Sequence, residues 1–97
     1  MAAYIIAKIE ITDIDKYKTY VAATPPVIAR FGGKFIARAG KTITLEGPEE
    51  ERRVVLLEFP SLDRAREFYD STEYQEVKKL RDSAAKVHLV AIEGVEK

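Results

Sequence analysis

LLEFPSLDRAREFYDSTEYQ, residues 56–75, is the stretch that decides the fold. It predicts a buried strand that Pro60 ends, because proline cannot donate to a sheet ladder. Ser61 then predicts the N-cap of a helix, since its hydroxyl can accept the free backbone amides of the first turn. Thr72 and Gln75 fit a capping box, which predicts a second helix directly after the first.

The first half of the chain repeats this strand-to-helix corner. A shift of 48 positions carries Asp13 onto Ser61 and carries residues 9–11 onto residues 57–59. Two similar halves joined by right-handed crossovers predict a βαββαβ, ferredoxin-like α+β fold. We expect an antiparallel sheet with the strands in the order fourth, first, third, second, and with both helical layers on one face.

Local signals set the expected boundaries. Asp13 is the expected cap of the first helix. Pro25 and Pro26 predict a bend or restart in that helix, with Thr24 as a possible new cap. Gly32 and Gly33 end it, because glycine adopts the left-handed conformation without steric cost. The expected strands cover residues 3–11, 34–39 with a continuation over 42–46 after a kink at 40–41, 52–59 and 87–93, and the last helix runs to about residue 85.

Alternation along the strands predicts two unlike faces of the sheet. The all-apolar face, expected under the helices, carries Ile5, Ala7, Ile9, Val55, Leu57 and Phe59. The opposite face carries Tyr4, Ile6, Lys8, Ile36, Arg38, Val54, Leu56 and Glu58. A contiguous apolar patch of this kind usually marks an interface. We expect two copies to pack these faces together as a two-fold homodimer; the alternative is a monomer with a patchy sheet.

Composition excludes several classes of protein. The 97 residues predict one domain over residues 1–97. Sixteen basic and 16 acidic residues give zero net charge, so the basic footprint of a nucleic-acid binder is missing. The chain has no Cys, which excludes disulfides and thiolate metal sites and fits a cytoplasmic location. We expect no membrane span, no signal peptide, no metal site and no cofactor.

Two charged residues are candidates for catalysis. Glu58 ends a central strand on a partly apolar face, where a carboxylate with a raised pKa can act as a base. The alternative is a structural ion pair at the dimer interface. Arg81 follows Tyr74 by nearly two helical turns, so both side chains point the same way. Arg81 is expected to hold a carboxylate ligand, unless it forms a buried ion pair or reaches solvent.

The remaining candidates line a pocket. Tyr17, Tyr20, Tyr69 and Tyr74 can each pack a ring and offer a hydroxyl, as core or as pocket wall. His88 is the single histidine, and a rim position is its default interpretation. One histidine without cysteine cannot build a closed zinc site. The sequence contains no phosphate-binding, nucleophile-elbow or zinc-protease motif.

Several motifs together resemble the family of domain of unknown function 1330. They are residues 31–38, 45–47, 58–61, Ala65, residues 68–69, residues 71–75 and Arg81. Ala39 departs from the usual glycine and Thr72 from the usual proline. The resemblance implies a ferredoxin-like subunit of a dimeric α+β barrel, a group that includes cofactor-free monooxygenases, muconolactone isomerases and haem-binding dismutases. It also singles out Arg38, Glu58, Tyr74 and Arg81 as the polar positions of the family.

We therefore expect a small homodimer that binds an aromatic or carboxylated molecule, without nucleic acid or membrane as partner. Arg38, Tyr17, Tyr74 and His88 are the expected ligand-binding residues. If the protein is an enzyme, we expect cofactor-free oxygenation or isomerisation, with Glu58 as the base and Arg81 beside the anion. The alternative is a non-catalytic assembly module whose polar groups only fix the dimer.

Overall fold

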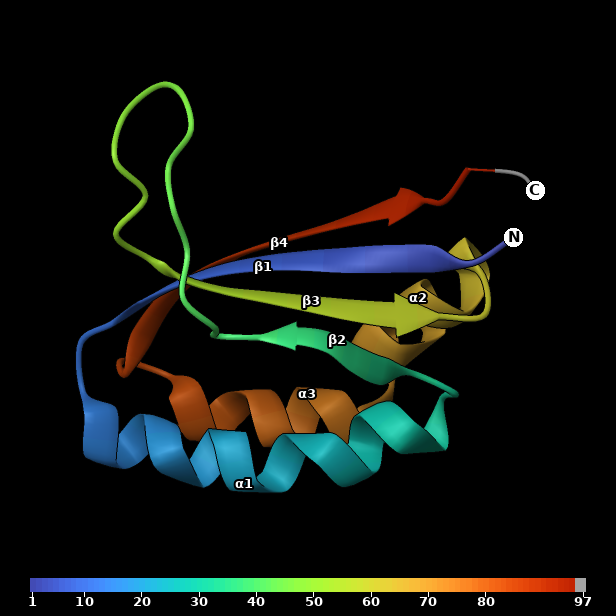
Figure 1. The fold of residues 1–97 in the computed structure, drawn as a ribbon. Helices are drawn as coiled ribbons and strands as arrows, with labels where there is room; N and C mark the ends of the chain where they lie inside the picture. The colour runs from blue at the N-terminus through green and yellow to red at the C-terminus, as the bar shows by residue number, and fades with distance from the viewer. Residues whose placement is uncertain (96–97) are drawn as a thin grey trace.

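The computed structural model describes residues 1–95 and contains one four-stranded sheet (Figure 1). The strands are β1 (Ala3–Ile11), β2 (Lys34–Arg38), β3 (Arg53–Phe59) and β4 (Ala85–Glu93). The helices are α1 (Ile14–Arg30), α2 (Leu62–Asp70), α3 (Thr72–Lys78) and the short 3-10 helix η1 (Lys79–Arg81). The order β2-β3-β1-β4, antiparallel at every step, confirms the expected ferredoxin-like α+β arrangement.

The helices cover one side of the sheet, and the other side carries none of the described helices (Figure 1). Register places Ile5 opposite Leu57 and Ala7 opposite Val55, so apolar side chains from both central strands share the helix side. We call this side the covered face. Its buried members are the six predicted ones, Ile5, Ala7, Ile9, Val55, Leu57 and Phe59. The opposite side, the open face, carries Tyr4, Ile6, Lys8, Val54, Leu56, Glu58, His88, Val90 and Ile92.

Side-chain caps begin the helices, and two of the three caps were predicted. Asp13 accepts from the Lys16 amide and Ser61 accepts from the Arg64 amide, as expected. The predicted Thr72 cap is wrong, because the hydroxyl of Ser71 accepts from the amide of Tyr74. Gln75 does not return to the Thr72 amide. Its Nε2 donates to the Tyr69 carbonyl over 2.7 Å and thereby joins α3 to the end of α2.

The expected restart of α1 at the prolines is also wrong, because the helix continues through Pro25 and Pro26. The Thr24 hydroxyl donates to the Tyr20 carbonyl at 2.6 Å instead of capping a new helix. Proline lacks an amide hydrogen, so Pro25 leaves the Val21 carbonyl without its usual helical donor. Arg38 Nη2 approaches that carbonyl at 3.5 Å. The proline pair thus opens an acceptor on the helix surface that faces β2.

A β-bulge in β2 reverses one predicted orientation. Phe35 pairs with Leu57, but Ala37 pairs with Leu56 and Arg38 pairs with Val55, with the irregularity between Phe35 and Ala37. The extra residue shifts the alternation, so Arg38 lies on the covered face and not on the open face where the sequence pattern placed it. This correction brings Arg38 to the helix side of the sheet.

Residues 39–52 form an arm instead of the predicted strand continuation over 42–46. The arm rises on the side of the sheet away from the helices (Figure 1). Its side chains Ile43 and Leu45 are 72% and 87% exposed. Glu50 holds the base of the arm against the open face through an ion pair of 3.2 Å with Lys8.

The last elements also differ from their predicted boundaries. The helical segment ends with η1 at Arg81 instead of running to residue 85, and β4 begins at Ala85 instead of residue 87. Ser83 adopts a positive φ of 63° and turns the chain toward the sheet. The Ala84 carbonyl then accepts from the amides of Thr12 and Asp13, which fixes the start of α1 beside β4.

Candidate ligand-binding site

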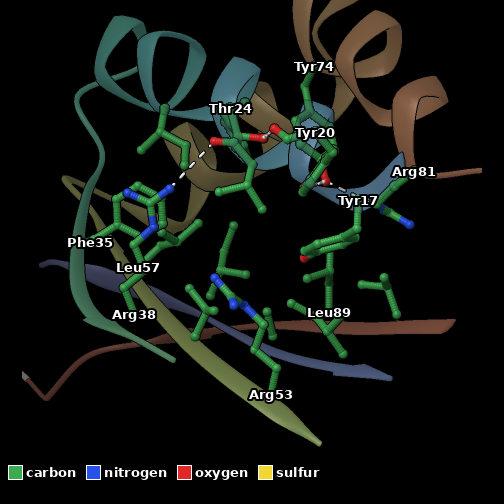
Figure 2. A pocket seen from close by; sticks show the side chains of 18 residues that line it. Tyr17, Tyr20, Thr24, Phe35, Arg38, Arg53, Leu57, Tyr74, Arg81 and Leu89 are labelled. Carbon is green, nitrogen blue, oxygen red and sulfur yellow. Dashed lines mark hydrogen bonds between the residues drawn. The ribbon is translucent and has the colours of Figure 1, made fainter. Parts of the chain in front are cut away.

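A pocket of about 60 Å³ lies between the covered face and the helices (Figure 2). Its floor comes from the central strands, including Ile5, Ala7 and Leu57, and its wall comes from Tyr17 and Thr24 of α1. The walls are mostly apolar, as in sites for small molecules, but the volume is below the roughly 300–1,000 Å³ of such sites, so a bound molecule would extend beyond it. Strand alternation builds the floor and helical spacing builds the wall, so the same patterns that produce the core produce the pocket.

Three arginines line this pocket from three different elements. Arg38 ends β2, Arg53 begins β3 and Arg81 ends η1. The lining contains no Asp or Glu, and no carboxylate of residues 1–95 forms a salt bridge with any of the three. The Arg38 guanidinium carbon lies 4.2 Å from the Phe35 ring centroid, a cation–π contact that leaves its charge uncompensated. The pocket is therefore strongly cationic although the chain as a whole is neutral.

Two of these arginines carry buried donors without partners. Among residues 1–95, the buried side-chain polar atoms that lack a hydrogen bond are the Nε atoms of Arg53 and Arg81. Arg81 is only 9% exposed, so its charge is largely removed from bulk water. A buried donor without an acceptor costs about 1–3 kcal/mol, and more when it is charged. An acceptor entering the pocket would therefore remove an existing energetic cost.

Neutral tyrosines surround Arg81. The hydroxyls of Tyr20 and Tyr74 lie 2.7 Å apart, and Arg81 Nη2 donates to the Tyr74 hydroxyl over 3.5 Å. Burial raises the pKa of Tyr20 far above its ordinary value, and the neighbouring Tyr74 adds to this rise. Burial also raises the pKa of Tyr17, although Arg53 and Arg81 oppose the effect. Tyr17 and Tyr20 therefore stay protonated near neutral pH, and they offer hydrogen bonds without negative charge.

Arg81 keeps its charge in this setting. Burial acts to lower its pKa, but the hydrogen bond to Tyr74 and the nearby Tyr20 outweigh burial and leave the pKa raised. The guanidinium carbon lies 5.4 Å from the Tyr20 ring centroid, within cation–π range. A fixed cation flanked by phenol hydroxyls is an arrangement that binds carboxylates or other small oxyanions.

Four of the six predicted site residues meet in this pocket: Tyr17, Arg38, Tyr74 and Arg81. Glu58 lies on the open face, opposite Tyr4 and Lys34, and pairs with Lys34 Nζ at 3.2 Å. His88 is exposed on β4, opposite Lys8 on the open face. It borders a larger depression of about 820 Å³ along β4 that also touches Tyr69, Lys78 and Arg81. The structure thus separates Glu58 from the arginine cluster, and His88 shares only this second depression with Arg81.

Arg53 is the residue that sequence reasoning missed. It pairs with Ile9, a buried residue of the covered face, and its Nε is one of the two unpartnered donors. The signal was present, because Arg53 shares its parity with Val55, Leu57 and Phe59 along one strand. Thr24 was considered only as a cap, yet it also lines the pocket.

Residues 1–95 bring no three potential metal-ligating side chains together. Across the same range, every helix is too short or too polar to cross a membrane.

Solved structures share this fold over nearly the whole chain. A protein of unknown function from Rhodopseudomonas palustris has a TM-score of 0.78 at 21% identity, covering 99% of this chain and 84% of that one. A dimeric ferredoxin-like protein of unknown function from Jannaschia sp. has a TM-score of 0.70 at 11% identity, with 97% and 100% covered. SnoaB, a cofactor-independent oxygenase from Streptomyces nogalater, has a TM-score of 0.69 at 11% identity, with 99% and 95% covered. At these identities the likeness shows the fold alone.

Curated proteins include no match to this sequence. The family model of a domain of unknown function, DUF1330, matches residues 2–95, which is nearly all of the chain. Together with the βαββαβ topology, this match shows that the chain belongs to the family of domain of unknown function 1330.

Proposed function

We propose that the protein binds a small carboxylated molecule with an apolar or aromatic body in the pocket between the covered face and α1. One observation carries the proposal. The two unpartnered buried donors of residues 1–95 are arginine Nε atoms, and both belong to residues that line this one pocket. A carboxylate supplies the missing acceptor and the missing negative charge together.

The ligand's apolar body would lie against the floor and the tyrosine wall. Tyr17 and Tyr20 have ring centroids 5.4 Å apart at an interplanar angle of 41°, and they present an aromatic surface beside the apolar floor. Aromatic and aliphatic groups gain free energy by leaving water for such a surface. Arg81 and the Tyr74 hydroxyl would orient the carboxylate, and Arg38 would contact the part of the ligand nearest β2.

The proposal assigns binding, without a catalytic base. The pocket lining contains no carboxylate and no histidine, and the raised pKa values of Tyr17 and Tyr20 keep these two phenols protonated near neutral pH. Glu58 as a base remains a prediction for the open face, where it forms an ion pair with Lys34. We also propose a cytoplasmic location, which the absence of cysteine fits.

Calorimetry tests the binding proposal with benzoate and benzamide as a matched pair. Benzoate should bind at least tenfold more tightly, because only its carboxylate neutralises Arg81. Arg81→Gln should remove that preference. Arg66→Gln is the control, since Arg66 is an exposed α2 residue paired with Asp70. If the unmodified protein binds benzoate and benzamide equally well, the proposal is wrong, whatever the variants show.

A second proposal concerns assembly and rests on the open face. Ile6, Val54 and Leu56 are half-buried in a single chain, and Val90 and Ile92 are exposed beside them on β4. Burying this apolar surface against a second copy would remove it from water on both partners. Two solved structures of this fold, from Jannaschia sp. and Thermobifida fusca, are described as dimeric, which supports a dimer here.

Sedimentation equilibrium tests the two-fold dimer. Leu56→Glu should raise the dimer dissociation constant by at least a hundredfold. It places a negative charge on each copy against the apolar surface of the other copy, and these charges repel each other. Leu62→Glu is the control, since Leu62 is partly exposed at the start of α2 on the helix side. A monomer at micromolar concentration for the unmodified protein would refute this proposal.

A further inference from the structure

We infer that the pocket is built for a ligand with two anionic groups, one at Arg81 and the other at Arg53 with Arg38. The inference rests on the proposed function and names its ligand class more narrowly, as a short dicarboxylate. It starts from the two unpartnered donors, whose side chains lie on either side of Tyr17 in the pocket lining (Figure 2).

The first end is formed by η1 and the helices around it. Arg81 is nine-tenths buried, and one terminal nitrogen of its guanidinium is engaged by the Tyr74 hydroxyl. The Tyr20 ring lies 5.4 Å from the guanidinium carbon, so the group has little freedom to turn toward solvent. Its Nε is buried and lacks an acceptor, so a ligand oxygen would reach it only after the surrounding side chains move.

The second end is formed by β3 and the bulged strand β2. Arg53 pairs with Ile9, and Arg38 pairs with Val55, two residues further along β3, so the two arginines are diagonal neighbours on the covered face. Arg53 Nε is buried and free, and Arg38 rests on the Phe35 ring. These two arginines bring two positive charges to this end without a carboxylate, and a bound anion would reduce the repulsion between them.

Tyr17 separates the two ends. Figure 2 shows its ring between the side chains of Arg53 and Arg81, with Arg38 on the far side of Arg53. The Arg53 guanidinium carbon lies 6.0 Å from the Tyr17 ring centroid, and the Tyr17 ring in turn contacts Tyr20, the neighbour of Arg81. A single carboxylate at one end therefore leaves the donor at the other end unsatisfied. A short apolar spacer along Tyr17 would let one molecule satisfy both.

Charge supports the same assignment. Arg38, Arg53 and Arg81 all act on the Tyr17 hydroxyl and lower its pKa against the effect of burial. One carboxylate compensates one of these three charges, whereas a dicarboxylate compensates two.

Calorimetry with succinate, glutarate and adipate, each beside its monomethyl ester, tests the inference. The ester keeps the length of the molecule and removes one charge. For the best-fitting length, the diacid should bind about tenfold to a hundredfold more tightly than its ester, as expected for a second charged hydrogen bond. That advantage should shrink when salt is raised, because Arg53 is only half-buried and Arg38 is exposed to solvent.

Two variants locate the two ends. Arg53→Gln should bring the ratio of diacid to ester affinity close to one, and Arg81→Gln should weaken diacid and ester together. Arg66→Gln serves again as the exposed control, and thermal unfolding establishes that each variant is folded.

The outcomes separate the inference from the proposed function. Equal affinity for diacid and ester in the unmodified protein, with benzoate still bound through Arg81, overturns the two-ended site and leaves the carboxylate site standing. No binding of any diacid, ester or benzoate overturns both. A diacid advantage that Arg53→Gln leaves intact also overturns the inference, because the second anion would then lie elsewhere.

Discussion

Leu56 and Leu57 are adjacent on β3, have the same side chain, and lie on opposite faces of the sheet. Leu57 belongs to the core cluster and borders the ligand pocket, whereas Leu56 is half-buried among the apolar residues of the open face. Strand alternation alone separates them. The apolar side chains of the covered face are buried within one chain, and of its buried polar side-chain atoms the arginine Nε donors alone lack partners among residues 1–95. The open face still exposes apolar side chains. The comparison teaches that the two faces differ in what remains unsatisfied: buried arginine donors on the covered face and apolar surface on the open face.

The largest expected effect comes from truncating these two leucines in turn. Leu57→Ala should lower the free energy of unfolding by about 2–5 kcal/mol, because it leaves a cavity among buried neighbours. This loss should be the same at all protein concentrations. Leu56→Ala should produce a loss that grows with protein concentration, since its packing partner would be a second copy. Denaturant unfolding at two concentrations measures both, and identical behaviour of the two variants would break the comparison.

Close packing between the covered face and α1 gives the next largest loss of stability. A Cβ on Gly33 would lie 2.6 Å from Phe59 Cε1 and 2.8 Å from Ile28 Cγ2, both of them buried. Gly33→Ala should therefore cost about 1–3 kcal/mol through overpacking. Gly40→Ala is the matched control, because no atom lies within 4 Å of its added Cβ. Thermal unfolding compares the two, and an unchanged midpoint for Gly33→Ala would contradict the close packing.

Alkaline pH gives a smaller effect on the same side. The pKa of Tyr20 is raised in the folded protein, so above the ordinary value of 10.0 the unfolded chain loses this proton while the folded chain keeps it. Stability is thus intact below pH 10.0 and falls as pH rises above it, by at most about 1.4 kcal/mol per pH unit for this group. Tyr20→Phe should flatten this fall and Tyr4→Phe, on the open face, should not. Urea unfolding from pH 9 to 11 (roughly the range set by an ordinary tyrosine) measures the slope.

The smallest effect belongs to the arm. Hydrogen bonds from Arg52 lower the pKa of Glu50 to about 2, and Lys8 contributes. This interaction is present above the ordinary pKa of 4.5 and is lost as pH falls toward 2. Because Glu50 is close to solvent, we expect local loosening of the arm and no change in global unfolding. NMR titration of Glu50 checks this, and a midpoint near 4.5 would contradict the anchoring.

The sequence predicted the covered face because apolar residues alternate without interruption along β1 and β3. Helical spacing also grouped Tyr74 with Arg81, and both line one pocket with Tyr17, while their role as a site stays a prediction. The bulge in β2 was not predictable, because no local residue type demands it and only register against β3 reveals it. The arm was misread for a related reason: residues 42–46 have strand-like composition, but composition does not supply a pairing partner.

Glu58 illustrates a different limit. Its position at the end of β3 was predicted correctly, and β1 pairs Tyr4 with it, but parity alone places it across the sheet from Arg81. The sequence pattern already contained this separation, since Glu58 alternates with Leu57 and Phe59. A resemblance that groups the polar positions of a family does not say on which side of a sheet each one lies.

The β2 bulge has a consequence for reading relatives of this chain. Because one inserted residue decides which way Arg38 points, a homologue that keeps the arginine but lacks the insertion would aim it away from the pocket. An arginine at the position of Arg38 in a homologue is thus a poor guide to shared ligand chemistry. Counting residues between the aromatic at position 35 and the arginine is the better guide, and a single deletion there would redirect a charge as effectively as replacing it.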